Sequence, residues 1–108
     1  AGFGPYALPK AGVVALMRQY AVEGGAIGVR SNAVNADRVN TALYSGGLLE
    51  RRAKARGLTL QDYLSGNLVA EEVFAEDVAQ AFIYLAQARK TTGAVIPVDG
   101  GNAAAFPR

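Results

Sequence analysis

The stretch GVRSNAVN, residues 28–35, has the composition of a short β-strand. A glycine opens it and the polar run 35–40 follows it, so the boundaries predict a strand over residues 28–35. A second stretch, GAVIPV at residues 93–98, predicts another strand, which the turn residues 99–101 end. Pro97 has no amide N–H to donate to a neighbouring strand, so we expect this second strand to lie at a sheet edge or to end there.

Helical patterns precede and separate the two strands. A helix is predicted over residues 6–23, and the two glycines that follow are expected to end it. The prediction rests on apolar side chains at positions i, i+3, i+4 and i+7, which are Val13, Leu16, Met17 and Tyr20. These four side chains are expected to serve as core or as oligomer contacts. Pro9 is tolerated only near the start of this helix, where its missing N–H costs little.

Further helices are predicted over residues 48–55, 60–64 and 75–88. Thr59 stands where it can cap the second of these, with Asp62 three residues later. The third has Glu76 and Asp77 in its first turn, where carboxylates complement the helix dipole. Val78, Phe82 and Leu85 share one face of this helix, and Phe82 and Tyr84 are expected to serve as core or as oligomer contacts.

The order helix, strand, helices, strand predicts an α/β fold in which a crossover joins two parallel strands. Parallel sheets are usually covered by helices on both faces and contain several more strands. Two strands with flanking helices therefore indicate one part of a larger doubly wound sheet.

Composition excludes several kinds of chemistry. The 108 residues include no cysteine and no histidine, so disulfides, thiolate nucleophiles and imidazole-based triads or metal sites are ruled out. The net charge of +2 argues against a nucleic-acid partner. No apolar stretch approaches the length of a membrane span, and no signal peptide is evident, so we expect a cytoplasmic protein. The acidic pairs 71–72 and 76–77 are interpreted as helix-start charges, and the basic run 51–56 as a solvated helix face.

Tyr6 and Lys10 are four residues apart at the start of the first predicted helix, so they share a face. A cation beside a phenol favours the phenolate and lowers the tyrosine pKa toward the range useful for proton transfer. Tyrosine and lysine often share this spacing without any catalytic role, so the pair is only suggestive by itself.

Three sequence motifs in a fixed order strengthen the case for a catalytic role of Tyr6 and Lys10. They are YALPK at 6–10, GVRSNAVN at 28–35 and TGAVIPVDGG at 92–101. Together they resemble the C-terminal half of the short-chain dehydrogenase/reductase family, over essentially the whole chain. Residues 6–41 and the segment AEDVAQAF, 75–82, resemble most the dehydrogenase part of bacterial bifunctional aldolase/dehydrogenase proteins of rhamnose metabolism. The resemblance implies the C-terminal half of a Rossmann-type doubly wound sheet and an NAD(P)-dependent oxidoreductase.

The resemblance also implies residue roles. Tyr6 would be the catalytic acid/base, and Lys10 would bind the nicotinamide ribose and lower the Tyr6 pKa. In the loop after the first strand, the backbone of Val39 would meet the nicotinamide carboxamide and the Thr41 hydroxyl could approach the cofactor. The substrate would be a small alcohol or carbonyl compound such as a sugar-derived one, and homo-oligomers would form through the first helix and the last strand.

The sequence also departs from the family pattern. Ala36-Asp37 replaces the usual Pro-Gly of the loop, which puts the loop conformation in doubt, and Asp37 is expected to face solvent. No glycine-rich phosphate loop is present, and five residues precede Tyr6, where a catalytic serine and asparagine would be expected. The chain is thus interpreted as a C-terminal fragment, inactive in isolation, with NAD or NADP undetermined. A non-catalytic interaction or assembly module remains the alternative.

Overall fold

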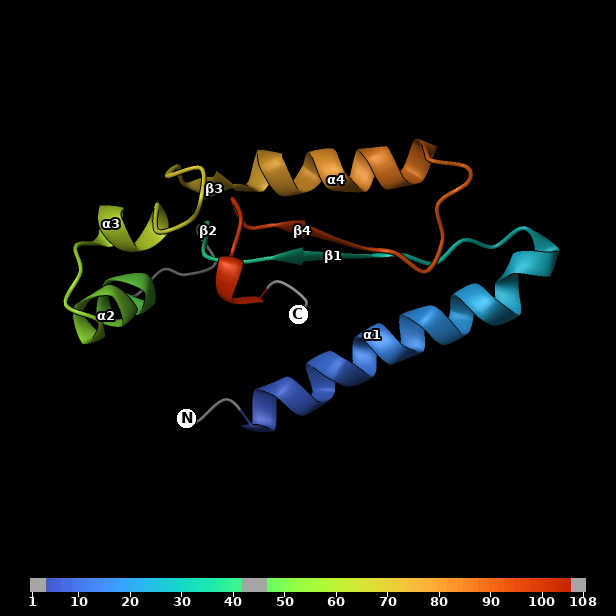
Figure 1. Cartoon of the computed structure of the whole chain (residues 1–108), viewed down its shortest axis with the longest axis horizontal. Helices are drawn as coiled ribbons and strands as arrows, with labels where there is room; N and C mark the ends of the chain where they lie inside the picture. Colours follow the sequence, from blue (N-terminus) through green and yellow to red (C-terminus); the bar gives the residue numbers. More distant parts are fainter. Residues whose placement is uncertain (1–3, 42–46, 106–108) are drawn as a thin grey trace. The chain divides into compact units, whose positions relative to one another are not determined.

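A computed structural model describes residues 4–41 and 47–105 of the chain. The elements in chain order are α1 (Gly4–Gly24), η1 (Gly25–Ile27), β1 (Ala33–Ala36), β2 (Val39–Asn40), α2 (Leu48–Ala55), α3 (Leu60–Leu64), β3 (Val73–Phe74), α4 (Ala75–Gln87), β4 (Val95–Val98) and η3 (Ala103–Ala105) (Figure 1). The chain divides into two compact units. The first unit comprises Ala1–Val34 and Phe82–Ile96, and the second comprises Asn35–Ala81 and Pro97–Arg108.

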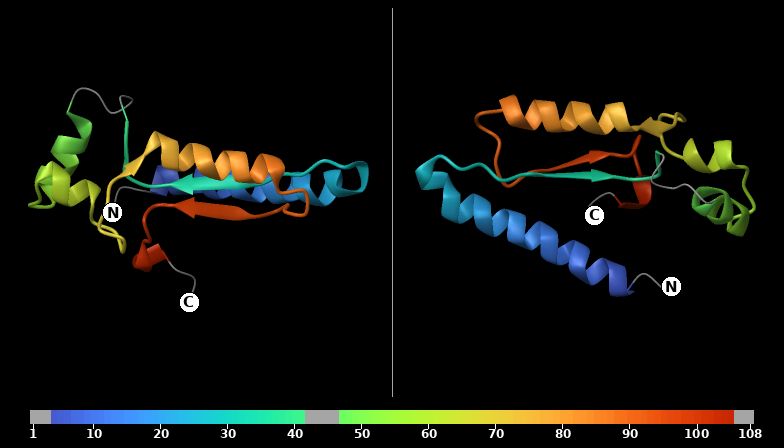
Figure 2. Two further views of the ribbon diagram at one scale, coloured as in Figure 1. Left: turned by 90° about the horizontal axis from the view of Figure 1, so that it is seen from above. Right: turned by 180° about the vertical axis from the view of Figure 1, so that it is seen from behind.

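The two predicted strands pair with each other as β1 and β4. Figure 2 shows them side by side with their arrows pointing the same way. The pairing begins where the amide of Ala33 donates to the carbonyl of Ala94, at 2.9 Å. Among the described strands β4 pairs with β1 alone, which leaves it at the edge that Pro97 requires. The predicted α/β class with parallel strands is confirmed.

The predicted start of the first strand at Gly28 is wrong, because β1 begins at Ala33. Asn32 is the physical reason. Its side-chain amide donates to the carbonyl of Thr91 at 2.9 Å, and its side-chain oxygen accepts from the amide of Ala94 at 3.0 Å. These side-chain bonds interrupt the backbone ladder, in which the amide of Gly93 donates to the carbonyl of Ser31 at 2.7 Å, so the segment before Ala33 is held without being a strand.

The predicted helices are found at nearly the predicted bounds. Residues 48–55 and 60–64 form α2 and α3 as predicted, and α4 ends one residue early, at Gln87. The cap at Thr59 is confirmed, since its hydroxyl accepts from the amide of Asp62 at 3.1 Å. Asp77 does more than complement the helix dipole, because its carboxylate accepts from the amide of Phe74, just before α4, at 2.8 Å.

The first helix begins at Gly4, two residues earlier than predicted. Pro9 therefore lies inside α1 and not in its first turn, so the helix gives up one backbone hydrogen bond there. In the first unit Met17 and Leu85 are buried, whereas Val13, Leu16 and Tyr20 of α1 are exposed.

The second unit has a small core in which α2 packs against α3. The buried side chains of this core come from both helices and are Leu49, Ala53, Tyr63 and Leu64. Leu60 is half-buried and packs against them. On α4 the covered positions are Val78, Ala81 and Leu85, while Phe82 is 59% exposed. Phe82, expected as a core or oligomer contact, therefore lies outside this core, because the covered face of α4 is centred on Ala81.

A second pair of strands, β2 and β3, was not predicted from the sequence. β2 and β3 run parallel in the second unit, with Val39 opposite Val73 and Asn40 opposite Phe74. Strands of two residues are too short to produce a periodic signal. The pairing of β2 with β3 places the segment that contains Val39 beside the segment that precedes α4.

Candidate functional site

The catalytic pair predicted from the sequence lies on α1. Tyr6 is in the first turn of this helix, but its side chain lies outside the described part of the chain. Lys10 follows one turn later with an exposed side chain. Residues four apart on a helix share a face, so the backbone of α1 has the spacing that the pair requires.

The predicted cofactor residues Val39 and Thr41 lie in the second unit, directly after β1. Val39 opens β2 and is half-buried, and Thr41 follows the strand. The hydroxyl oxygen of Thr41 is buried and has no hydrogen-bond partner, alone among the buried side-chain oxygens and nitrogens of residues 8–41 and 47–104, the side chains that the structure describes. A buried polar group without a partner costs about 1–3 kcal/mol, so native proteins rarely leave one unless a further group binds there.

Arg38, which the sequence reading did not single out, anchors this loop to α3. Its guanidinium donates to the carbonyl of Tyr63 at 3.2 Å and to that of Gly66 at 3.4 Å. It also stacks over the Tyr63 ring, 4.6 Å from the ring centroid, and Arg56 stacks over the same ring at 5.3 Å. Such cation–π contacts contribute about 0.5–2 kcal/mol each.

The backbone of Arg38 has a φ of +50°, an uncommon conformation for a residue other than glycine. The neighbouring positions, 36 and 37, are those where Ala-Asp replaces the family's Pro-Gly. The Arg38 contacts thus supply, through a side chain, the loop restraint that turn residues would otherwise supply. No local sequence pattern indicates this, because the partner carbonyls lie 25 and 28 residues away.

The Asp37 side chain is half exposed, as expected for a carboxylate that faces solvent. Its nearest cation is Arg38, whose Nε lies 3.7 Å from a carboxylate oxygen. An exposed pair at this distance contributes about 0–1 kcal/mol.

The turn after β4 approaches the same loop region within the second unit. Gly100 has a φ of +68°, and a Cβ there would clash with the side chain of Asn67. The amides of Leu68 and Val69 donate to the carbonyls of Gly101 and Gly100. A polar cavity of about 30 Å³ lies here, large enough for about one water molecule, and its lining includes Asp37, Arg38, Gly66, Asn67, Asp99 and Asn102.

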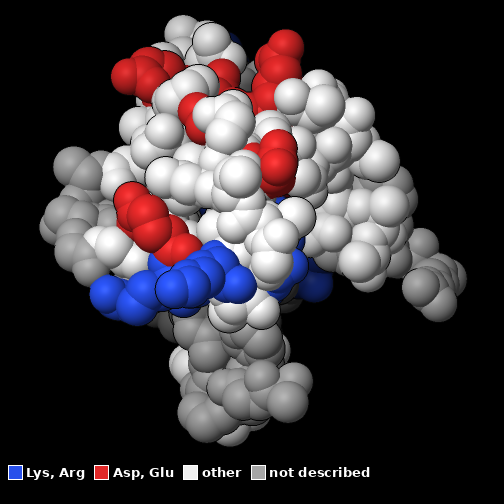
Figure 3. Space-filling view, turned by 90° about the vertical axis from the view of Figure 1, so that its left-hand side faces the viewer, with Lys and Arg blue, Asp and Glu red and all other residues white. Residues whose placement is uncertain are grey.

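The basic side chains of the run 51–56 are exposed, as expected for a solvated helix face, whereas Ala53 between them is buried. Figure 3 shows basic groups gathered beside acidic ones on the side of the molecule that it displays. Within the described residues no cluster of three or more acidic side chains could hold a metal ion. None of the described helices is both long and apolar enough to cross a bilayer.

The comparisons with known proteins give the family. The family model described as enoyl-(acyl carrier protein) reductase matches residues 1–103. A solved oxidoreductase of the short-chain dehydrogenase/reductase family from Burkholderia thailandensis is 31% identical, with a TM-score of 0.74 over 96% of this chain and 39% of that one. The chain belongs to the short-chain dehydrogenase/reductase family.

Two further structures of dehydrogenases contain nicotinamide cofactors. A small-chain dehydrogenase in complex with NADPH is 30% identical, with a TM-score of 0.69 over 84% of this chain and 39% of that one. A 4-hydroxyisoleucine dehydrogenase mutant with NADH and succinate is 26% identical, with a TM-score of 0.73 over 94% of this chain and 40% of that one.

Among the curated relatives, the uncharacterized oxidoreductase YuxG of Bacillus subtilis is 37% identical over 95% of this chain. The matched region is 16% of YuxG, whereas it is 34–39% of four other relatives. This short-chain dehydrogenase/reductase chain therefore spans well under half the length of the relatives that it matches.

Proposed function

We propose that the chain forms the part of an NAD(P)-dependent oxidoreductase that carries the acid/base pair and the nicotinamide loop. The observation that supports this most directly is the buried, unpartnered hydroxyl of Thr41. It lies on the loop that follows the carboxyl end of a parallel strand, where α/β folds bind their ligands. A cofactor that bonds to this hydroxyl would remove the cost of leaving it unpartnered.

The proposed chemistry requires few groups of this chain. A bound nicotinamide would supply or accept the hydride. Tyr6 would donate a proton to a carbonyl oxygen of the substrate, or remove one from an alcohol. Lys10 would hydrogen-bond the nicotinamide ribose and favour the Tyr6 phenolate. Val39 would hold the carboxamide through its backbone, and Thr41 would bond to the cofactor through its hydroxyl.

We further propose that the natural substrate is a small, sugar-derived alcohol or carbonyl compound in a bifunctional aldolase/dehydrogenase protein. The length of YuxG supports this, because the matched region is less than half as large a share of YuxG as of the other relatives. YuxG therefore has room for a further domain. Either NAD or NADP would serve as the cofactor, since the related structures contain NADH in one case and NADPH in another.

Homo-oligomers through the first helix and the last strand, and a cytoplasmic location, stay predictions. The exposed side chains Val13, Leu16 and Tyr20 of α1 are ones that such an interface would cover. The alternative of a non-catalytic assembly module makes a contrary prediction about the cofactor. Titration of the intact protein with NADH and NADPH, followed by nicotinamide fluorescence, would show no saturable binding if that alternative were correct.

Replacing Thr41 with valine tests the proposed cofactor contact through two effects of opposite sign. Valine has the same shape without the hydroxyl, so the free protein should become more stable by about 1 kcal/mol. Loss of the cofactor hydrogen bond should raise the Kd for the nicotinamide cofactor by about fivefold to tenfold. Urea unfolding of the cofactor-free protein and fluorescence titration measure the two effects separately.

The matched control is Thr59→Val. Its hydroxyl already accepts a hydrogen bond as the cap of α3, so its loss should destabilise the protein by about 1 kcal/mol. Cofactor affinity should stay unchanged in this variant. If Thr41→Val also lost stability and kept its cofactor affinity, Thr41 would have no place in the cofactor site.

Replacing Arg38 with alanine should release the loop. The change removes one hydrogen bond to Tyr63 of α3, one to Gly66 just after α3, and one stacking contact, so we expect the cofactor Kd to rise by about tenfold. Arg56→Ala is the control, since Arg56 stacks over the same ring at 5.3 Å and lies outside the loop. Equal Kd values for the two variants would show that the loop does not depend on Arg38.

A further inference from the structure

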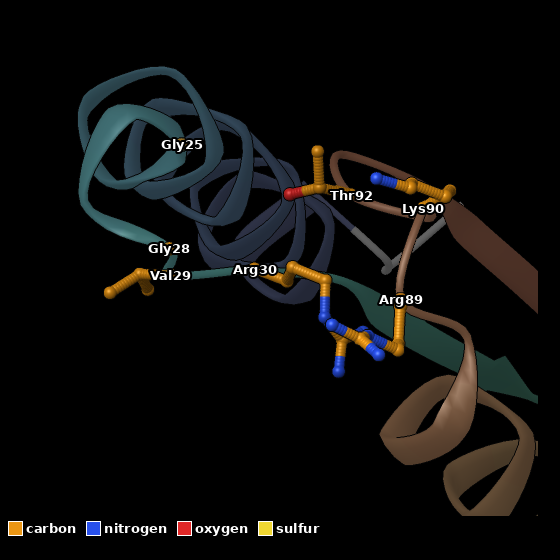
Figure 4. Close-up of a pocket in the computed structure, with 7 residues that line it drawn as sticks. All are labelled: Gly25, Gly28, Val29, Arg30, Arg89, Lys90 and Thr92. Carbon is orange, nitrogen blue, oxygen red and sulfur yellow. The ribbon is translucent and has the colours of Figure 1, made fainter.

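A second cleft lies before the amino ends of β1 and β4, wholly within the first unit. Its volume is about 450 Å³, within the usual range of about 300–1,000 Å³ for small-molecule sites. The described residues that line it are Gly25, Gly28, Val29, Arg30, Arg89, Lys90 and Thr92 (Figure 4). The proposed nicotinamide loop, by contrast, follows the carboxyl end of β1.

The charge of this cleft has one sign. Of the described lining residues, Arg30, Arg89 and Lys90 are cations and none is a carboxylate. The cleft also lies at the end of α4, where the helix dipole contributes about half a negative charge. Three full positive charges outweigh that half charge, so the cleft stays strongly positive. Figure 4 shows the cations arising from two segments, the one before β1 and the one between α4 and β4.

Arg30 is held in a fixed position at this site. Its guanidinium donates to the carbonyls of Leu85 at 2.7 Å, Ala88 at 3.0 Å and Ala86 at 3.1 Å. These bonds satisfy two of the last carbonyls of α4 and one just after it, and they use three of the five N–H groups of the guanidinium. Its charge therefore remains oriented in the cleft, and no carboxylate of the described residues pairs with it.

The rest of the wall leaves room for a ligand. A Cβ built on Gly25 or on Gly28 would meet no atom within 4 Å, so both glycines border open space. Thr92 is fixed by the amide of Ser31, which donates to its hydroxyl at 3.1 Å. Arg89 and Lys90 are exposed and take part in no hydrogen bond or ion pair within the described residues, so their donors are available to an anion.

We infer that this cleft binds the phosphate group of a small molecule, with Arg89 and Lys90 as its contacts and Arg30 as a fixed neighbouring charge. Guanidinium and ammonium groups bind phosphate oxygens through strong, charge-assisted hydrogen bonds. The phosphate could be the free ion or an ester. The inference stands apart from the proposed oxidoreductase function, since it uses no residue of that site.

Protection of Lys90 from acetylation in the intact protein tests this site. The test compares glycerol 1-phosphate, inorganic phosphate and glycerol, and mass spectrometry reads each lysine separately. At about ten times its Kd, a phosphate ligand should slow the acetylation of Lys90 by about tenfold. Lys54, which is exposed on α2, is the internal control and should react at an unchanged rate.

The two phosphate probes identify the source of the group. Stronger protection by glycerol 1-phosphate indicates an ester, and equal protection by inorganic phosphate indicates the free ion. Arg89→Ala should weaken protection by about tenfold, whereas Arg52→Ala on α2 should leave it intact. Unprotected Lys90, equal protection of Lys54, or equal protection by glycerol would each overturn the inference.

Discussion

Replacing Tyr6 with phenylalanine is expected to lower the turnover of the intact enzyme by about 10²–10⁴-fold. Phenylalanine keeps the ring and removes the hydroxyl, so no group remains at this position to donate or accept the proton. The Kd for NADH or NADPH should stay within about twofold of its original value, because the proposed cofactor contacts belong to Lys10, Val39 and Thr41. Steady-state kinetics on the best alcohol or carbonyl substrate, together with fluorescence titration, separate the two quantities.

Tyr20→Phe provides the matched control for this variant. Tyr20 lies on the same helix and is 55% exposed, so the loss of its hydroxyl should change neither turnover nor affinity. Full turnover in the Tyr6→Phe protein would remove Tyr6 from the acid/base role. A parallel loss of cofactor affinity would show instead that the phenol helps to bind the nicotinamide cofactor.

The sequence predicted the elements that have a local signal. Three kinds of signal depend only on neighbouring residues: the apolar spacing on α1 and α4, the Thr59 cap, and the turn after Val98. The helices and strand that they mark lie close to their predicted bounds. The start of β1 was predicted wrongly because the Asn32 side chain forms hydrogen bonds with Thr91 and Ala94, which are 59 and 62 positions further along the chain. Long-range bonds of this kind leave no trace in a short window of sequence.

The residues of the candidate site also differ in whether a sequence pattern or a long-range contact reveals them. Tyr6, Lys10, Val39 and Thr41 were predicted as site residues through a resemblance between ordered motifs, which needs no knowledge of contacts, and their roles stay predictions. Arg38 was missed, since its importance arises from the carbonyl and ring of Tyr63 on α3 and from the carbonyl of Gly66 just after α3.

The core between α2 and α3 leads to the last prediction, Leu64→Ala. Leu64 is 2% exposed and belongs to the cluster with Leu49, Ala53 and Tyr63. Removing its buried carbons should lower the free energy of unfolding by about 2–5 kcal/mol, as measured by urea denaturation. Leu68→Ala is the matched control: Leu68 is 64% exposed, so its truncation should cost less than about 0.5 kcal/mol.

The same variant tests how the core supports the loop. Tyr63, the neighbour of Leu64, supplies both the carbonyl and the ring that hold Arg38. A cavity under α3 should therefore loosen the loop, so the cofactor Kd should rise in Leu64→Ala and stay constant in Leu68→Ala. Lost stability with unchanged affinity would mean that the loop is held independently of the core. Loss of both would identify the packing of α3 against α2 as the support on which the nicotinamide loop depends.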